Sequence, residues 1–286
     1  MIEAEDNYGL LTETSGIEET RNPEKQRHLP PSVALDWLRA GWRDLKTQAG
    51  ISIAYGLAVY GVSLLVVVGM FAVGWDHILF PAIAGFMIVG PVVAIGLYEK
   101  SRALEVGRPV SLKTMLGVRA RSGAQIVFVG VLLCLLMLLW MRSAVIIYAL
   151  FFGYRPFPGL QSIAPMLFGT TVGWTMMVTG TVIDGLFAAF SFAISAFSIP
   201  MLLNERTDAM TAMSTSMSLV WNNLRVMIAW GALALGLFLA SLLSGLVGLV
   251  VIFPLLGHTA WHAYKAIRRP DPVGLSGSNE AKMARG

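Results

Sequence analysis

The sequence is poor in charged residues and almost free of cysteine, and each shortage excludes a class of protein. Charged residues make up 13% of the 286 positions and hydrophobic residues 56%, with a mean hydropathy of +0.67. An ordinary soluble domain, about a quarter of which is charged, is therefore excluded. Cys134 is the one cysteine, so an internal disulfide or a thiolate metal site is excluded too. We expect a membrane protein.

An early apolar run is also lacking, because the first long one begins at Ile51. The polar, acidic segment before it lacks the basic start and short apolar core of a cleavable signal peptide. We expect residues 1–31 to form a disordered cytoplasmic tail, and residues 270–286 to form a second one. The membrane domain would then comprise residues 32–269.

Six apolar stretches are long enough to cross a bilayer core of about 30 Å, which requires about 20 helical residues. They cover residues 51–73, 78–98, 124–150, 175–203, 226–243 and 246–264. Of the 21 lysines and arginines, 19 lie on one side of these stretches, and the other two are Arg142 and Arg155. The positive-inside rule then places both termini in the cytoplasm. We expect this basic collar to attract anionic lipid headgroups, and we expect no nucleic-acid partner.

The six stretches fall into three copies of one unit, at about 32–102, 109–203 and 207–268. Each unit has an amphipathic segment, an apolar span, and a second span that carries a proline. Trp42 and Trp221 each begin a Trp-x-x-Leu-cation joint and are expected to be interfacial anchors. The predicted fold is all-α, with six transmembrane helices in three parallel repeats, each an interfacial amphipathic helix followed by a helix pair.

The prolines of the second spans, Pro91, Pro200 and Pro254, predict helix kinks. Each proline frees the carbonyl four residues earlier, which must find a partner or face a cavity. The third amphipathic segment carries an apolar stripe that we expect to pack on lipid or on neighbouring spans. The stripe comprises Met210, Met213, Met217, Trp221 and Leu224.

Arg142 and Asp184 are the two charges deep inside predicted spans. Each lies about 20 residues, or roughly 30 Å, from the cytoplasmic end of its span. We predict that they form an intramembrane ion pair near the outer interface. The alternative is that both side chains extend separately to the outer headgroups.

His258 and His262 are spaced i, i+4 on one helical face, a spacing that can bind a metal. The zinc-protease helix has a glutamate between its two histidines, whereas residues 259–261 here are Thr-Ala-Trp. We therefore expect hydrogen-bonding histidines near the cytoplasmic interface and no cofactor. A metal or haem site in which Glu99 joins the two histidines is the alternative.

Several motifs in this order resemble an uncharacterised bacterial integral membrane family, domain of unknown function 2189. They are Leu38-Arg-Ala-Gly-Trp-Arg-Asp-Leu45, Ser52-Ile-Ala-Tyr-Gly-Leu57, Ala84-Gly-Phe-Met-Ile-Val-Gly-Pro91, Leu97-Tyr-Glu-Lys-Ser-Arg102 and Phe253-Pro-Leu-Leu-Gly-His-Thr-Ala-Trp-His262. The resemblance covers about residues 32–268. It implies a multi-pass protein of the bacterial inner membrane and no particular activity.

Three functions are compatible with these features. A non-enzymatic accessory or scaffold subunit of a membrane complex is favoured by the amphipathic surfaces and by the lack of a catalytic motif. A transporter or channel for a small solute or lipid is favoured by the repeats and kinked spans. A membrane-embedded enzyme would require His258, His262 and Glu99 to converge.

Overall fold

The structure, a computed structural model, describes residues 29–75, 78–118, 120–153 and 160–268. The predicted tails, 1–31 and 270–286, lie outside these ranges except for residues 29–31. The helices, in chain order, are α2 (Val33–Lys46), α3 (Ala49–Ala72), α4 (Leu79–Val93), α5 (Ile95–Glu105), α6 (Leu112–Leu116), α7 (Gly123–Phe152), α8 (Leu160–Phe168), α9 (Thr171–Ser195), α10 (Ser198–Asn204), α11 (Ala209–Asn222), α12 (Leu224–Leu243) and α13 (Leu249–Ile267).

Four of these helical stretches are long and apolar enough to cross a bilayer: Ala49–Ala72, Gly123–Phe152, Thr171–Asn204 and Leu224–Leu243. They coincide with the first, third, fourth and fifth predicted spans. The second predicted span is divided, because α4 ends at Val93 after 15 residues and α5 begins at Ile95. The sixth corresponds to the 19 residues of α13, whose second half is polar. Over the residues that it describes, the structure is thus all-helical with four candidate spans.

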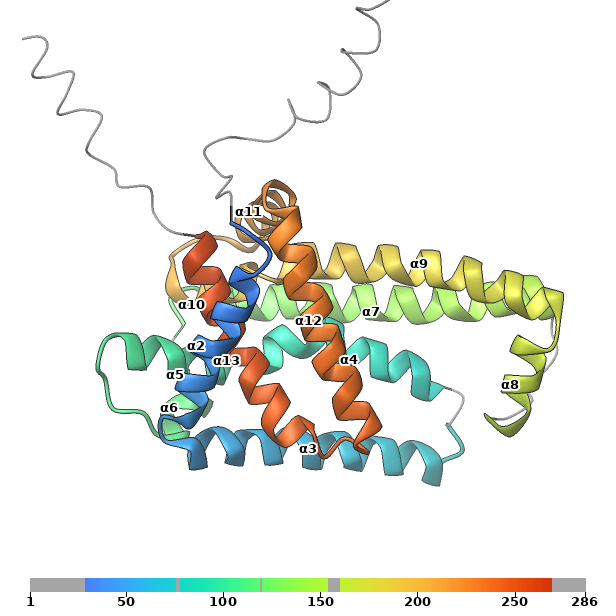
Figure 1. Cartoon of the computed structure of the whole chain (residues 1–286), viewed down its shortest axis with the longest axis horizontal. Coiled ribbons are helices and arrows are strands. Elements are labelled where there is room, and N and C mark those ends of the chain that lie inside the picture. Colours follow the sequence, from blue (N-terminus) through green and yellow to red (C-terminus); the bar gives the residue numbers. More distant parts are fainter. Residues whose placement is uncertain (1–28, 76–77, 119, 154–159, 269–286) are drawn as a thin grey trace, which may run out of the picture.

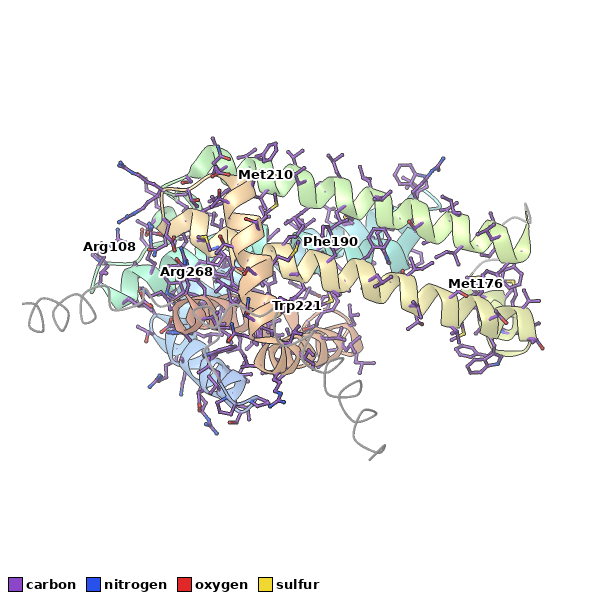
Figure 2. All side chains as sticks on the ribbon, turned by 90° about the horizontal axis from the view of Figure 1, so that it is seen from above. Arg108, Met176, Phe190, Met210, Trp221 and Arg268 are labelled. Atoms are coloured by element: carbon purple, nitrogen blue, oxygen red, sulfur yellow. The ribbon has the colours of Figure 1, made fainter. Side chains whose placement is uncertain are left out.

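The long helices do not form one parallel bundle. Figure 1 shows α3, α7 and α9 along the long axis of the molecule, whereas the hairpin of α12 and α13 crosses that direction steeply. In Figure 2, α11 lies crosswise over α7 and α9. Because a surface helix lies along the bilayer plane and a span lies across it, this orientation suits the interfacial position predicted for α11.

Helix α13 is the hub of the described structure, since it packs against α2, α3 and α5. Glycines permit the closest approaches: Gly41 of α2 lies against Thr259, and Gly56 of α3 lies against the backbone of Val250. Small residues at helix crossings allow backbones to approach and gain dispersion contacts. The buried face of α2, at helical spacing, is Ala34, Trp37, Gly41 and Leu45.

The short helices pack in a regular order along the chain. Helix α6 packs on α5, α11 packs on α9 and α10, and α2 packs on α13. In the predicted repeats, each amphipathic segment therefore rests on the second helix of another unit.

Helix breaks lie near two of the three prolines. The break between α4 and α5 follows Pro91 by three residues, and the break between α9 and α10 precedes Pro200. Ser216 of α11 bridges the second break, because its hydroxyl donates to the Ala193 carbonyl (2.7 Å) and accepts from the Phe197 amide (3.1 Å). Helix α13 continues through Pro254.

Enlarging Gly56 should destabilise the crossing of α3 and α13. The Cβ of Gly56→Ala would overlap the Val250 carbonyl, so the helices must separate, and overpacking of this kind costs about 1–3 kcal/mol. Gly61→Ala on the same helix is the control, because its Cβ meets nothing within 4 Å. We expect a lower apparent melting temperature in detergent for Gly56→Ala only. Equal melting of the two variants would contradict this packing.

Candidate functional site

Six polar side chains form a continuous hydrogen-bonded chain where α2, α3, α5 and α13 meet. We call it the polar chain, and in order it comprises Lys100, Ser52, His258, Ser101, Asp44 and His262. The first four are 0% exposed, whereas Asp44 and His262 are partly exposed. The polar chain therefore connects a buried ammonium group to the protein surface.

The distances of the polar chain are those of ordinary hydrogen bonds. Lys100 Nζ donates to Ser52 Oγ at 2.7 Å, and Ser52 Oγ lies 3.0 Å from His258 Nε2. His258 Nδ1 lies 2.8 Å from Ser101 Oγ, which donates to Asp44 Oδ2 at 2.6 Å. The same carboxylate oxygen lies 2.9 Å from His262 Nε2.

Lys100 carries a charge that no carboxylate touches. Its ammonium group also donates to the Gln48 carbonyl at 3.4 Å, and no ion pair of the described residues includes it. Burial disfavours the charged form and lowers the pKa of Lys100 to about 8, while the negative charge of Asp44 opposes this shift. A buried amine of this kind indicates a functional or tightly coupled position.

Asp44 remains a carboxylate at the other end. Burial acts to raise its pKa, but the hydrogen bonds from His262 and Ser101 outweigh burial and lower it. The anion therefore persists at neutral pH, at a distance from the ammonium group of Lys100.

The structure brings His258 and His262 into the polar chain but gives Glu99 other partners. Glu99 forms ion pairs with Arg102 and, at 3.6 Å, with Arg108. Within the described ranges, no group of three or more His, Cys, Asp or Glu side chains is placed to hold a metal ion. The three residues of the predicted alternative site therefore belong to two separate networks.

Further ion pairs hold the polar ends of α5, α10 and α13 together. Glu105 accepts from Trp261 Nε1 at 2.9 Å and pairs with Lys265 at 3.4 Å. Glu205 accepts from the Tyr264 hydroxyl at 2.6 Å and pairs with Arg268 at 3.2 Å. This end of α13 is therefore fixed by charge-assisted contacts.

The predicted pair of Arg142 and Asp184 is not among the ion pairs of the described residues. Asp184 instead accepts a hydrogen bond from Trp140 Nε1 at 2.6 Å. An indole N–H satisfies a carboxylate oxygen without a second charge, and this contact joins α7 to α9.

The predicted anchors and the methionine stripe are largely exposed. Trp42 is 42% exposed, with Lys46 Nζ 5.7 Å from its ring centre, and Trp221 is 49% exposed. On α11, Met210 and Trp221 are exposed (Figure 2). Met217 is exposed as well, whereas Met213 is buried. The stripe therefore does not form one face that packs against the other described helices, and its packing on lipid stays a prediction. The buried face of α11 instead comprises Ala209, Ala212, Met213, Ser216, Leu219, Val220 and Asn222.

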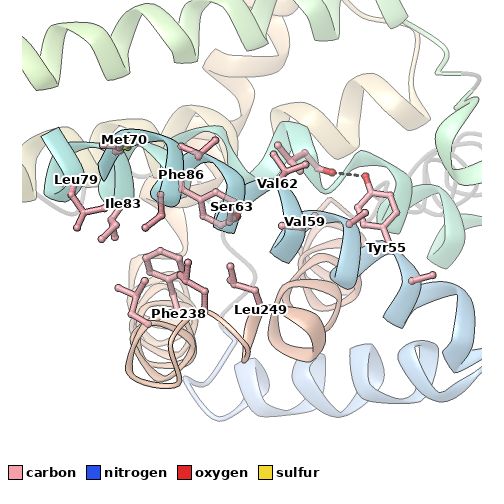
Figure 3. A pocket seen from close by; sticks show the side chains of 18 of the residues that line it. Tyr55, Val59, Val62, Ser63, Met70, Leu79, Ile83, Phe86, Phe238 and Leu249 are labelled. Carbon is pink, nitrogen blue, oxygen red and sulfur yellow. Dashed lines mark hydrogen bonds between the residues drawn. The ribbon is translucent and has the colours of Figure 1, made fainter. Parts of the chain in front are cut away.

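An apolar groove of about 460 Å³ lies between α3, α4, α6 and α12. Figure 3 shows its walls, among them Val59, Val62, Met70, Ile83, Phe86 and Phe238. Phe86 and Phe238 stack with ring centres 5.8 Å apart and close one side. At one end, the Tyr55 hydroxyl donates to the Val93 carbonyl (2.6 Å), beside the break between α4 and α5. The groove thus has almost entirely apolar walls.

The described residues form four helical stretches that are long and apolar enough to cross a bilayer, and ion pairs hold the polar ends of α5, α10 and α13 together. These features are those of a helical integral membrane protein. Residues 79–204 match the model of the family DUF2189, described as a predicted integral membrane protein. The resemblance stated from the sequence is thereby confirmed over these residues. The motifs around Trp42 and His258 lie outside the matched segment. No curated protein and no solved structure matches the chain.

Sequence reasoning did not identify Asp44, Ser52, Lys100 and Ser101 as members of a site. Asp44, Ser52, Lys100 and Ser101 all lie in motifs quoted for the resemblance alone, apart from the place of Lys100 in the basic collar. One signal was present: a lysine next to a serine directly after an apolar stretch, in Tyr98-Glu-Lys-Ser101. Their convergence arises from packing between segments up to 218 positions apart.

The buried ammonium group should make stability depend on pH in a defined window. The pKa of Lys100 is about 8 in the folded protein and about 10.5 when unfolded, so the folded form releases its proton first. The free energy of unfolding therefore increases, through this group, by at most about 3 kcal/mol as the pH rises from about 8 to about 10.5. We expect Lys100→Met to lack this gain in melting experiments, whereas Lys113→Met, at an exposed lysine, keeps it. Parallel pH profiles of wild type and Lys100→Met would contradict the assignment.

Proposed function

We propose that the protein is a non-enzymatic, multi-pass membrane protein that binds the acyl chain of a membrane lipid in the groove between α3, α4 and α12. The observation that carries this proposal is the groove itself, whose volume of about 460 Å³ is typical of ligand sites. The proposal develops one of the functions that the sequence left open, a transporter or channel for a small solute or lipid.

The position of the groove favours an acyl chain as occupant. Two of its walls, α3 and α12, are candidate spans, so we expect its open side to face the bilayer interior. From Tyr55 to Met70 the α3 wall is roughly 22 Å long, more than half of a hydrocarbon core of about 30 Å. Transfer between apolar surroundings yields little hydrophobic energy, so shape and aromatic contacts would select the chain.

We place the protein in the bacterial inner membrane with both termini in the cytoplasm, as a six-span protein of three parallel repeats. The distribution of lysine and arginine supports this orientation. The order in which α2, α6 and α11 rest on helices of other units supports the repeats. In this placement the polar chain lies at the cytoplasmic side, and the basic collar contacts anionic headgroups.

Filling the groove should reduce lipid binding. Ala58 lines it and is exposed, so Ala58→Trp would place an indole where the acyl chain lies. Ala188→Trp on α9 is the matched control, because Ala188 is exposed outside the groove lining. We expect native mass spectrometry of protein extracted in mild detergent to show fewer bound phospholipids for Ala58→Trp only. Unchanged lipid retention by Ala58→Trp would refute the proposal.

A second candidate is an accessory or scaffold subunit of a membrane complex. It is favoured by the outward face of α11, where Met210, Met217 and Trp221 are 63%, 40% and 49% exposed. Flexible methionines adapt to varied partners.

This second role predicts protein contacts at the α11 face. A photo-crosslinking residue at Met217 should capture a defined neighbouring protein in native membranes, because the face is exposed. The same residue at Val178 of α9, which is 62% exposed, should react with lipid alone. Crosslinks to lipid alone at both positions would exclude the scaffold role for this face.

A further inference from the structure

The polar chain has one consistent direction of hydrogen-bond donation. Ser101 uses its single proton to donate to Asp44, so its oxygen accepts from His258 Nδ1–H. A second positive charge beside Lys100 is disfavoured in this buried place, so His258 is neutral and its Nε2 accepts from Ser52. Ser52 in turn accepts from Lys100. Every member between the two ends therefore donates one proton and accepts another.

Its two ends carry opposite charges that do not touch. The ammonium group of Lys100 and the carboxylate of Asp44 are separated by three neutral side chains, each within hydrogen-bond distance of the next. Buried opposite charges ordinarily pair directly, because separation in a low dielectric is costly. Hydrogen-bonded chains in such surroundings polarise cooperatively, which stabilises separated end charges.

We propose that the polar chain is a proton relay between Lys100 and the Asp44–His262 pair at the protein surface. In one passage, Lys100 gives a proton to Ser52 as Ser52 gives its own to His258 Nε2. His258 passes its Nδ1 proton to Ser101, and Ser101 passes its proton to Asp44. Lys100 ends as a neutral amine and Asp44 as a neutral acid, so atoms and charge balance.

The surface end suits exchange with water. Asp44 and His262 have side chains that are 17% and 23% exposed, whereas Lys100 is 0% exposed. His262 lies 2.9 Å from the same oxygen that receives the relayed proton, and an imidazole can both donate and accept a proton. Among the charged and titratable groups on the elements packed around Lys100, Asp44 on α2 and His258 on α13 interact with its charge, and Glu99 of α5 and Arg108 line the same cavity as Lys100.

A competing route to Lys100 exists. A cavity of about 220 Å³ between α5 and α6 is lined by Lys100, Glu99 and Arg108, among others. Water entering there would exchange the ammonium protons without the polar chain. The ammonium group itself, however, is directed to Ser52 and the Gln48 carbonyl.

The decisive measurement is the rate at which the Lys100 ammonium protons exchange with water, observed by NMR of the full chain with ¹⁵N-labelled lysine. The Lys100 signal is assigned by its loss in Lys100→Met. We expect Ser101→Ala, which does not touch Lys100, to slow the exchange by about tenfold or more. Ser101→Thr keeps a hydroxyl group and should restore the wild-type rate. Ser198→Ala is the control, since Ser198 is a fully buried serine outside the polar chain.

A second variant keeps the test decisive if Ser101→Ala fails to fold. His258→Gln retains a donor and an acceptor but cannot relay a proton, so it should slow exchange to the same extent. Wild-type exchange in a folded Ser101→Ala or His258→Gln variant would show that protons reach Lys100 through the cavity, and would overturn the relay. Failure of Ser101→Thr to restore the rate would overturn it as well.

Discussion

One requirement governs this structure: the polar side chains of α13, a helix surrounded by apolar segments, must form hydrogen bonds. The second half of α13 carries His258, Thr259, His262 and Tyr264 directly after an apolar stretch. Buried without partners, each polar side chain would cost several kcal/mol. Helices α2, α3, α5 and α10 supply partners for His258, His262 and Tyr264, and their packing around α13 follows from this requirement. Thr259 instead donates to the Leu255 carbonyl of α13 itself.

Glycines make that arrangement sterically possible. Where α13 crosses α2 and α3, Gly41 and Gly56 remove the side chain that would hold the backbones apart. The close crossing brings Ser52 within reach of both His258 and Lys100. Apolar packing and hydrogen bonding are thus coupled at one place, while most of α3 and α7 is not buried in the structure. The apolar groove lies at the boundary between these two regions.

The proposed lipid site and the proposed relay occupy different parts of the same helices. Tyr55 lines the groove, and Ser52 of the polar chain lies three residues earlier on α3. Helix α5 carries Lys100, and its first turn follows the break beside which Tyr55 donates to the Val93 carbonyl. In these proposals, a change in the charge of Lys100 would occur near the Tyr55 end of the groove. Neither function requires the other, since the two sites share helices and no side chain.

The sequence by itself determined the membrane class, four of the apolar spans and the family resemblance, because hydropathy and span length are local properties. It also indicated that His258 and His262 lie on one helical face, and we expected both to form hydrogen bonds. Only the tertiary structure decided that Glu99 turns to Arg102, that Asp184 bonds Trp140, and that α12 and α13 cross the long helices. Partners such as Ser52 and His258 are 206 positions apart, and no periodic pattern specifies which distant side chains meet. That choice depends on how glycine-containing faces fit together in space.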